Sequence, residues 1–357
     1  MDTGITREQY KQLQAILWEF RKVELPDTRR RDEKLQRLTG LTPDLIDCCV
    51  NNCMAFTGPH LELTRCKECN ELRYSDNDWP RNNFPYLPVT TILQHTYGNP
   101  ARAKLLETYP KPFLDQPLNT PPEKISDWWS GKRFRELRMQ GYFTSSTDIA
   151  FQIQIDGFQV TKRNQHSTTP VILLNLNLPP EIRYRKQNII CPFIIPGPSK
   201  YKNLDSFLQP LVDELKILGS PHGINTYSAY QGSNFRLRAY AVLFSGDGPA
   251  ISEAIGMKAP GNAKKPCRFC EVEATQAPNN HYYIPHPKNP SATSRPLRLR
   301  KNLRQTIELA TASPSIAGNK EGMASLIFKA RLITIRDNKK NCPPRPTNPP
   351  LPSQLRY

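Results

Sequence analysis

The chain has 357 residues, of which 49 are Lys or Arg and 32 are Asp or Glu, so its formal net charge is +17. This charge favours a polyanionic partner such as nucleic acid over a neutral or acidic one. No apolar run is long enough to cross a bilayer, so no membrane partner is expected. The N-terminus lacks the pattern of a signal peptide, which indicates a reducing compartment where clustered cysteines bind metal rather than form disulfides.

Residues 1–40 are predicted to form a helical segment. Apolar side chains recur at helical spacing from residue 7 to 24, which predicts an amphipathic helix that serves packing. A second, shorter helix is expected near Asp32–Leu38.

Five cysteines gather in residues 44–75, which predicts a zinc-binding segment. Cys66 and Cys69 have the spacing of a zinc knuckle, and a second pair ends at Cys53. Tetrahedral Zn²⁺ takes four thiolates, so one of Cys48 and Cys49 is spare, and we take Cys49 as the ligand. The alternative is a group of ordinary buried cysteines.

Residues 76–147 are expected to be an irregular and helical linker region. A helix is predicted from Leu93 to Tyr109, and the stretch from Pro110 to Pro122 is predicted to be a linker. Trp128 opens another short helical stretch that ends near Gly141.

Residues 148–287 alternate strands with helices and form the predicted core. Phe151, Ile153 and Ile155 alternate with glutamines, which predicts a strand with one buried face. The other predicted elements are strands over 171–176, 189–195 and 235–245 and helices over 206–218 and 251–257.

Three strands, a helix, a strand and a helix follow one another in the order of an RNase H-like fold, an α/β architecture with a mixed sheet. Its first and fourth strands lie side by side. Asp156 and Asp247 end these two strands, so we expect them to meet although 91 positions separate them (247 − 156). Such carboxylates can hold Mg²⁺ or Mn²⁺ for phosphoryl transfer. Alternatively, Asp156-Gly157 and Asp247-Gly248 are turn dipeptides.

Cys267 and Cys270 form a second knuckle-spaced pair. His281 and His286 follow at a spacing that could complete a zinc site, and a pair of core cysteines with two surface histidines is the alternative. Residues 288–357 are basic and rich in proline, so this tail is predicted to be largely disordered.

Taken together, the motifs resemble the transposases of CACTA-type DNA transposons, in the form found in basidiomycete fungi. The resemblance runs from about Asp47 to Pro285. It is carried by Cys48–Gly58, Cys66–Tyr74, Asp156–Phe158, Asn177–Arg183, Ile195–Pro198, Asp205–Leu215, Gly246–Ala250 and Pro266–Cys270.

This resemblance implies a partial RNase H-like core with a DDE/D triad, which cleaves and transfers DNA strands at transposon ends in the nucleus and could self-associate. It places Asp156 and Asp247 at two catalytic positions that hold Mg²⁺ or Mn²⁺, and Zn²⁺ at the cysteines. The third acid has no counterpart, because Glu308, Glu321 and Asp337 lack the family's sequence context. We therefore expect a C-terminally truncated transposase that does not complete the reaction. The alternative is a non-catalytic, zinc-containing DNA-binding or interaction protein derived from a transposon.

Overall fold

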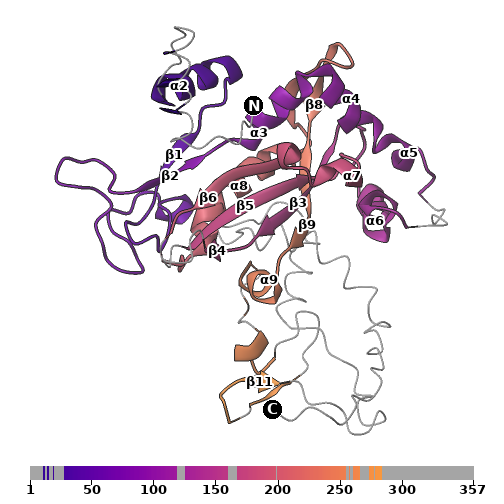
Figure 1. Ribbon diagram of the computed structural model, residues 1–357. Helices are drawn as coiled ribbons and strands as arrows, with labels where there is room; N and C mark the ends of the chain where they lie inside the picture. Colours follow the sequence, from indigo (N-terminus) through magenta and orange to yellow (C-terminus); the bar gives the residue numbers. More distant parts are fainter. Residues whose placement is uncertain are drawn as a thin grey trace, which may run out of the picture.

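The computed structural model of the protein is shown in Figure 1. It describes residues 11–12, 14–15, 19, 28–118, 125–159, 167–197, 199–254, 257, 260–265, 273–276 and 278–283. The helix predicted over 7–24 lies almost entirely outside these residues, and the tail predicted over 288–357 lies wholly outside them.

A five-stranded mixed sheet forms the centre of the fold. Strand β5 pairs antiparallel with three neighbours, and β3 also pairs parallel with β9. The strands are β3 (Ile149–Ile155), β4 (Phe158–Gln159), β5 (Ser167–Asn175), β6 (Ile189–Ile195) and β9 (Ala239–Ser245). The protein is therefore of mixed α/β class, and its first and last long strands are neighbours as the sequence predicted.

Both faces of this sheet are covered. The alternating apolar residues of β3, among them Phe151 and Ile153, face helix α8 (Leu204–Leu218) in the main core. The opposite face carries Ala150 and Val242 and packs against Trp129 of η2 (Trp128–Ser130) and helix α6 (Lys132–Met139). This is the layered arrangement by which an α/β domain buries an amphipathic sheet.

The predicted strand over 235–245 is wrong in one respect, because it is two strands. β8 (Ser233–Leu237) pairs with β7 (Ile224–Ser228) in a separate antiparallel hairpin, whereas β9 joins the central sheet. The break falls at Arg238, whose side chain turns to Asp148. An apolar run alone cannot reveal such a change of partner.

Likewise, the helix predicted from Leu93 to Tyr109 is two helices, α3 (Val89–Tyr97) and α4 (Pro100–Thr108). Pro100 cannot continue a helix but suits the first turn of a new one, and Asn99 Oδ1 accepts from Arg102 N to cap α4. The short helix α5 (Lys111–Leu114) occupies the start of the predicted linker.

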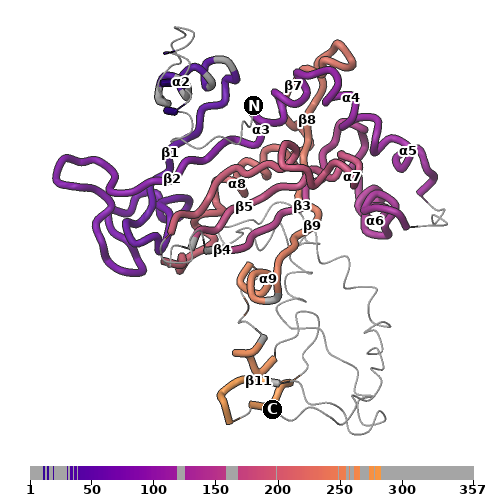
Figure 2. The backbone as a smooth tube through the Cα atoms, in the orientation of Figure 1, coloured from indigo at the N-terminus to yellow at the C-terminus, as the bar shows by residue number. Residues whose placement is uncertain are grey.

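Residues 44–86 make an excursion from the β6 side of the sheet, as the tube in Figure 2 shows. It begins with β1 (Asp44–Asp47) and ends with β2 (Asn83–Tyr86), which pair antiparallel, and it contains η1 (Gly58–His60). Leu87 N donates to Pro192 O at 2.8 Å, which joins the excursion to β6.

The remaining elements lie outside the central sheet. They are α2 (Thr28–Thr39), α7 (Pro180–Arg183), η3 (Lys186–Asn188), α9 (Gly248–Ala254), η4 (Pro260–Asn262), β10 (Thr275–Gln276) and β11 (Tyr282–Tyr283). Among the described residues, no helix has the length and apolar character needed to cross a membrane.

Candidate functional site: a carboxylate edge and a cysteine cluster

Asp156 and Asp247 lie at the same edge of the central sheet. The last residues that pair β3 with β9 are Gln154 and Ser245, and each aspartate follows this last pair by two positions. Neighbouring strands run about 4.8 Å apart. Both side chains are exposed at this edge, where a phosphate group could approach them.

A bulge in β9 sets this alignment. Ile149 pairs with Ala239, an offset of 90 positions (239 − 149), whereas Gln154 pairs with Ser245, an offset of 91 (245 − 154). The register shifts between Phe151 and Gln152. Because Asp156 and Asp247 also differ by 91, the register after the bulge brings the two aspartates level. A bulge that re-aims side chains beside a functional edge is a recurrent device in sheets.

Asp247 also begins a helix. Its Oδ1 accepts from Ala250 N at 2.7 Å and its backbone oxygen accepts from Ile251 N at 3.0 Å, so it caps α9. This is a common structural role for aspartate. Asp247 therefore has a structural task besides any chemical one.

Helix α9 is also held from the loop that follows β6. Glu253 accepts from Lys200 Nζ at 2.9 Å and from the Tyr201 hydroxyl at 3.3 Å. Sequence reasoning missed this connection, because nothing in the sequence relates a loop residue to a helix residue 53 positions away.

Four cysteines form a compact cluster in the excursion between β1 and β2. The sulfurs of Cys49, Cys53, Cys66 and Cys69 all lie within 4.8 Å of one another. Tetrahedral Zn²⁺ with Zn–S bonds of about 2.3 Å places its sulfurs roughly 3.8 Å apart, so the donor set fits such an ion. These four cysteines could hold a metal ion such as zinc.

Cys48 and Cys49 are adjacent but lie in different environments. Cys49 belongs to the cluster, with its sulfur 3.4 Å from that of Cys69. Cys48 is buried among the apolar residues of the main core. Neighbouring side chains of an extended segment point in opposite directions, and Cys48 forms an isolated bridge with Ala55 in this segment.

The ionisation of the cluster is uneven. Burial raises the pKa of Cys53 to about 12 and that of Cys66 to about 11. Burial also raises the pKa of Cys69, but hydrogen bonds from the backbone of Glu71 and from Cys49 and Asn51 outweigh it and lower this pKa to about 7. Crowded thiolates repel one another, which favours the protonated thiols. A bound divalent ion favours the thiolates instead.

The cluster is fixed to the sheet edge by hydrogen bonds. Cys53 O accepts from Lys202 N and Asn203 N, each at 2.9 Å, and Asn52 Nδ2 donates to Gly197 O at 2.6 Å. These partners lie in the loop that follows β6. Strands β6 and β3 run in the same direction, because both pair antiparallel with β5, so their last residues lie at the same end of the sheet. The cluster therefore docks at the same end of the sheet as Asp156.

The second predicted zinc motif is not described in full. Cys267, Cys270 and His286 lie outside the described residues. His281 is exposed, and its backbone N–H donates to Asn279 Oδ1 at 3.1 Å. That motif stays a prediction.

A comparison with protein families places the chain in a known class. The model of the transposase family tnp2 matches residues 124–324, more than half of the chain. The chain belongs to this transposase family. No curated protein matches the sequence.

The matched range differs from the resemblance seen in the sequence. It starts at residue 124, after the cysteine cluster, and it continues past Pro285 to residue 324. Glu308 and Glu321 therefore lie inside the matched range, although outside the described residues.

Proposed function

We propose that this protein is a CACTA-type transposase of fungal origin, with an RNase H-like core of the kind that acts on the phosphodiester bonds of transposon DNA. The observation that carries the proposal is the parallel pairing of β3 with β9, which sets Asp156 and Asp247 on one edge of the sheet. Membership of a transposase family and a net charge of +17 support a DNA partner.

In this proposal Asp156 and Asp247 hold Mg²⁺ or Mn²⁺. Carboxylate oxygens are the ligands these ions prefer, and a bound ion supplies Lewis-acid activation of a hydroxyl group and charge stabilisation of the phosphate. The strands keep the two carboxylates in place, and Glu253, through Lys200 and Tyr201, steadies the helix that Asp247 caps.

The third acid of the triad is unassigned, so we propose that the 357-residue chain binds metal and DNA without completing strand cleavage. We also propose a nuclear location, Zn²⁺ at Cys49, Cys53, Cys66 and Cys69, and self-association on DNA.

The test is a Mn²⁺ titration followed by electron paramagnetic resonance, combined with a cleavage assay on duplexes that carry the element's own ends. Asp156→Asn and Asp247→Asn are each expected to weaken Mn²⁺ binding at least tenfold, and Asp213→Asn on α8 serves as the control. Equal Mn²⁺ binding by all variants would refute the metal role. Strand cleavage that Asp156→Asn abolishes would refute the proposed inactivity.

The helix cap at Asp247 favours a second candidate function, a zinc-containing DNA-binding or interaction protein without catalysis. Asn also caps helices, so Asp247→Asn keeps the cap while it removes the charge. The second candidate predicts that Asp156→Asn and Asp247→Asn leave DNA binding and Mn²⁺ binding unchanged, whereas Cys66→Ser disrupts folding or DNA binding. A Mn²⁺ signal lost in the aspartate variants would refute this candidate.

A further inference from the structure

The hairpin of β7 and β8 comes just before β9 in the chain and is separate from the central sheet. One of its faces is buried: Phe235 lies 4.8 Å from the Tyr97 ring of α3, measured between ring centroids, and Leu237 is fully buried. Thr226 and Ser228 of β7 are also buried. The hairpin therefore has a defined inner face and a defined outer face.

A buried carboxylate anchors this hairpin. Glu107 of α4 is only 3% exposed and accepts from Ser228 Oγ and Gln231 Nε2, each at 2.6 Å. Ala229 N donates to Tyr97 O at 2.9 Å. These contacts hold the turn against α3 and α4, so the outer face is presented by a rigid support.

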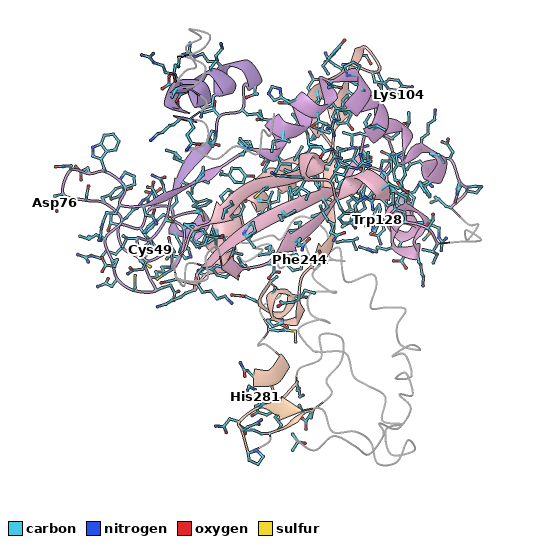
Figure 3. The ribbon with its side chains drawn as sticks, in the orientation of Figure 1. Cys49, Asp76, Lys104, Trp128, Phe244 and His281 are labelled. Atoms are coloured by element: carbon cyan, nitrogen blue, oxygen red, sulfur yellow. The ribbon has the colours of Figure 1, made fainter. Side chains whose placement is uncertain are left out.

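The outer face and the tip carry exposed polar and aromatic side chains. Register places Tyr227 opposite Asn234 and Asn225 opposite Arg236, and all four are exposed. At the tip, Tyr230 is 46% exposed and Lys104 Nζ lies 6.0 Å from its ring centroid. Figure 3 shows Lys104 on α4 at this end of the molecule. We call these six residues the hairpin surface: Lys104, Asn225, Tyr227, Tyr230, Asn234 and Arg236.

The two stretches that form and support the hairpin surface are rich in positive charge. Within residues 89–108 and 219–246 the only carboxylate is Glu107, which is buried and hydrogen-bonded. The same stretches contain Arg102, Lys104 and Arg236, and also Arg238, whose charge is paired with Asp148. The excursion differs, because residues 58–82 hold five acidic and four basic side chains. Positive charge without exposed carboxylates favours a phosphate backbone over a protein surface of mixed charge.

We propose that the hairpin surface binds the backbone of duplex DNA. In this arrangement Lys104 and Arg236 contact phosphates, while Asn225, Asn234 and the two tyrosine hydroxyls donate to phosphate or sugar oxygens. A two-stranded ribbon is also narrow enough to lie along the major groove. The assignment rests on the transposase function proposed above, for which it names a second contact area away from the carboxylate edge.

The test measures binding of the zinc-loaded full chain to a 30-base-pair duplex of mixed sequence by fluorescence anisotropy at several salt concentrations. Each lost phosphate contact lowers the slope of log K against log salt by about 0.9. Lys104→Gln with Arg236→Gln should therefore lower this slope by nearly two and weaken binding about tenfold or more. The matched control is Arg81→Gln with Lys216→Gln, which removes the same charge from cations paired with Glu71 and Asp213.

A second double variant keeps side-chain size. Asn225→Asp with Asn234→Asp adds two carboxylates to the outer face and should weaken DNA binding at least tenfold, with an unchanged unfolding midpoint. If both hairpin variants bind the duplex as the unmodified chain does, the hairpin proposal fails, and a protein partner becomes the better assignment for this face. If the unmodified chain itself binds no duplex, the proposed DNA function fails as well. The Mn²⁺ titration reports separately on the carboxylate edge.

Discussion

Arg238 donates two hydrogen bonds of 2.9 Å to the carboxylate of Asp148, which lies just before β3 while Arg238 lies just before β9. Asp148 is fully buried, and burial raises its pKa above the ordinary value despite the attraction of Arg238. The pair fixes the starts of the two parallel strands whose far ends carry Asp156 and Asp247. Register at the carboxylate edge therefore depends on an ion pair at the opposite end.

Breaking this pair should destabilise the fold strongly. Arg238→Ala leaves a buried carboxylate without its cation, and we expect the free energy of unfolding at pH 7 to fall by about 3–5 kcal/mol. Urea unfolding followed by circular dichroism measures it. The control is Arg236→Ala, an exposed neighbour, which should change it by no more than about 0.5 kcal/mol. Equal losses in the two variants would contradict this account of the strand starts.

A second buried pair predicts acid sensitivity. Arg183 donates to both carboxylate oxygens of Asp127, at 2.9 and 2.7 Å, and Tyr109 donates at 2.7 Å. Burial raises the pKa of Asp127, but these hydrogen bonds outweigh it, so the pKa lies below its ordinary value of 3.8. A lowered pKa in the folded state contributes stability above pH 4 that is lost as the pH falls through the folded value.

We therefore expect Asp127→Asn to be less stable than the unmodified protein at pH 7 and to show a shallower decline in unfolding free energy below about pH 4. Unfolding midpoints measured from pH 6 to pH 2 test this. Asp148→Asn is the control, because the raised pKa of Asp148 has the opposite sign and its loss should not flatten the curve. Parallel curves for Asp127→Asn and the unmodified chain would rule out the ion pair as the cause.

The cysteine cluster predicts which neighbour binds metal. Cys49→Ser should lose one Zn²⁺ per chain relative to the unmodified protein, because it removes one of four sulfurs within 4.8 Å. Cys48→Ala should retain the metal, since Cys48 lies in the apolar core. Zinc is measured by atomic emission after dialysis. Retention of metal by Cys49→Ser with its loss in Cys48→Ala would reverse the assignment.

A carboxylate from another helix caps α3. Glu214 of α8 accepts from Val89 N at 2.9 Å and Thr90 N at 2.5 Å, and it also accepts from the Tyr86 hydroxyl. Glu214→Ala leaves these donors unpaired and should lower the free energy of unfolding by about 1–3 kcal/mol. The adjacent and exposed Asp213→Ala is the control in the same urea titration. An equal loss of unfolding free energy in Asp213→Ala would contradict the capping role of Glu214.

Much of the sheet could be predicted from the sequence because its pattern is local. Phe151, Ile153 and Ile155 alternate with glutamines, and α8 shows an apolar stripe that ends at Gly219, so periodicity alone located both elements. The parallel pairing of β3 and β9 followed from the order of the elements. The cysteine cluster followed from ligand spacing, which is a constraint on the chain itself.

What could not be predicted depends on partners far apart in the sequence. Glu214 caps α3 across 125 residues, and no local signal marks it. The residues of β7 alternate weakly and end in a polar turn, so no strand is predicted there, and β8 and β9 are predicted as one strand over 235–245. The bulge that aligns Asp156 with Asp247 is invisible as well, because Val242 is an ordinary strand residue and only the register of its partner shows that it is extra.

Strand β9 runs from the end of the β7–β8 hairpin to the carboxylate edge. Its seven residues span about 23 Å at 3.3 Å per residue, which is nearly the length of seven base pairs of duplex at about 3.4 Å each. Because β9 is hydrogen-bonded along β3, its length is fixed, and DNA bound at the hairpin surface would lie at a set distance from a group held by the two aspartates. The strand therefore fixes the spacing between the hairpin surface and the carboxylate edge. An insertion within β9 would change that spacing along a bound DNA.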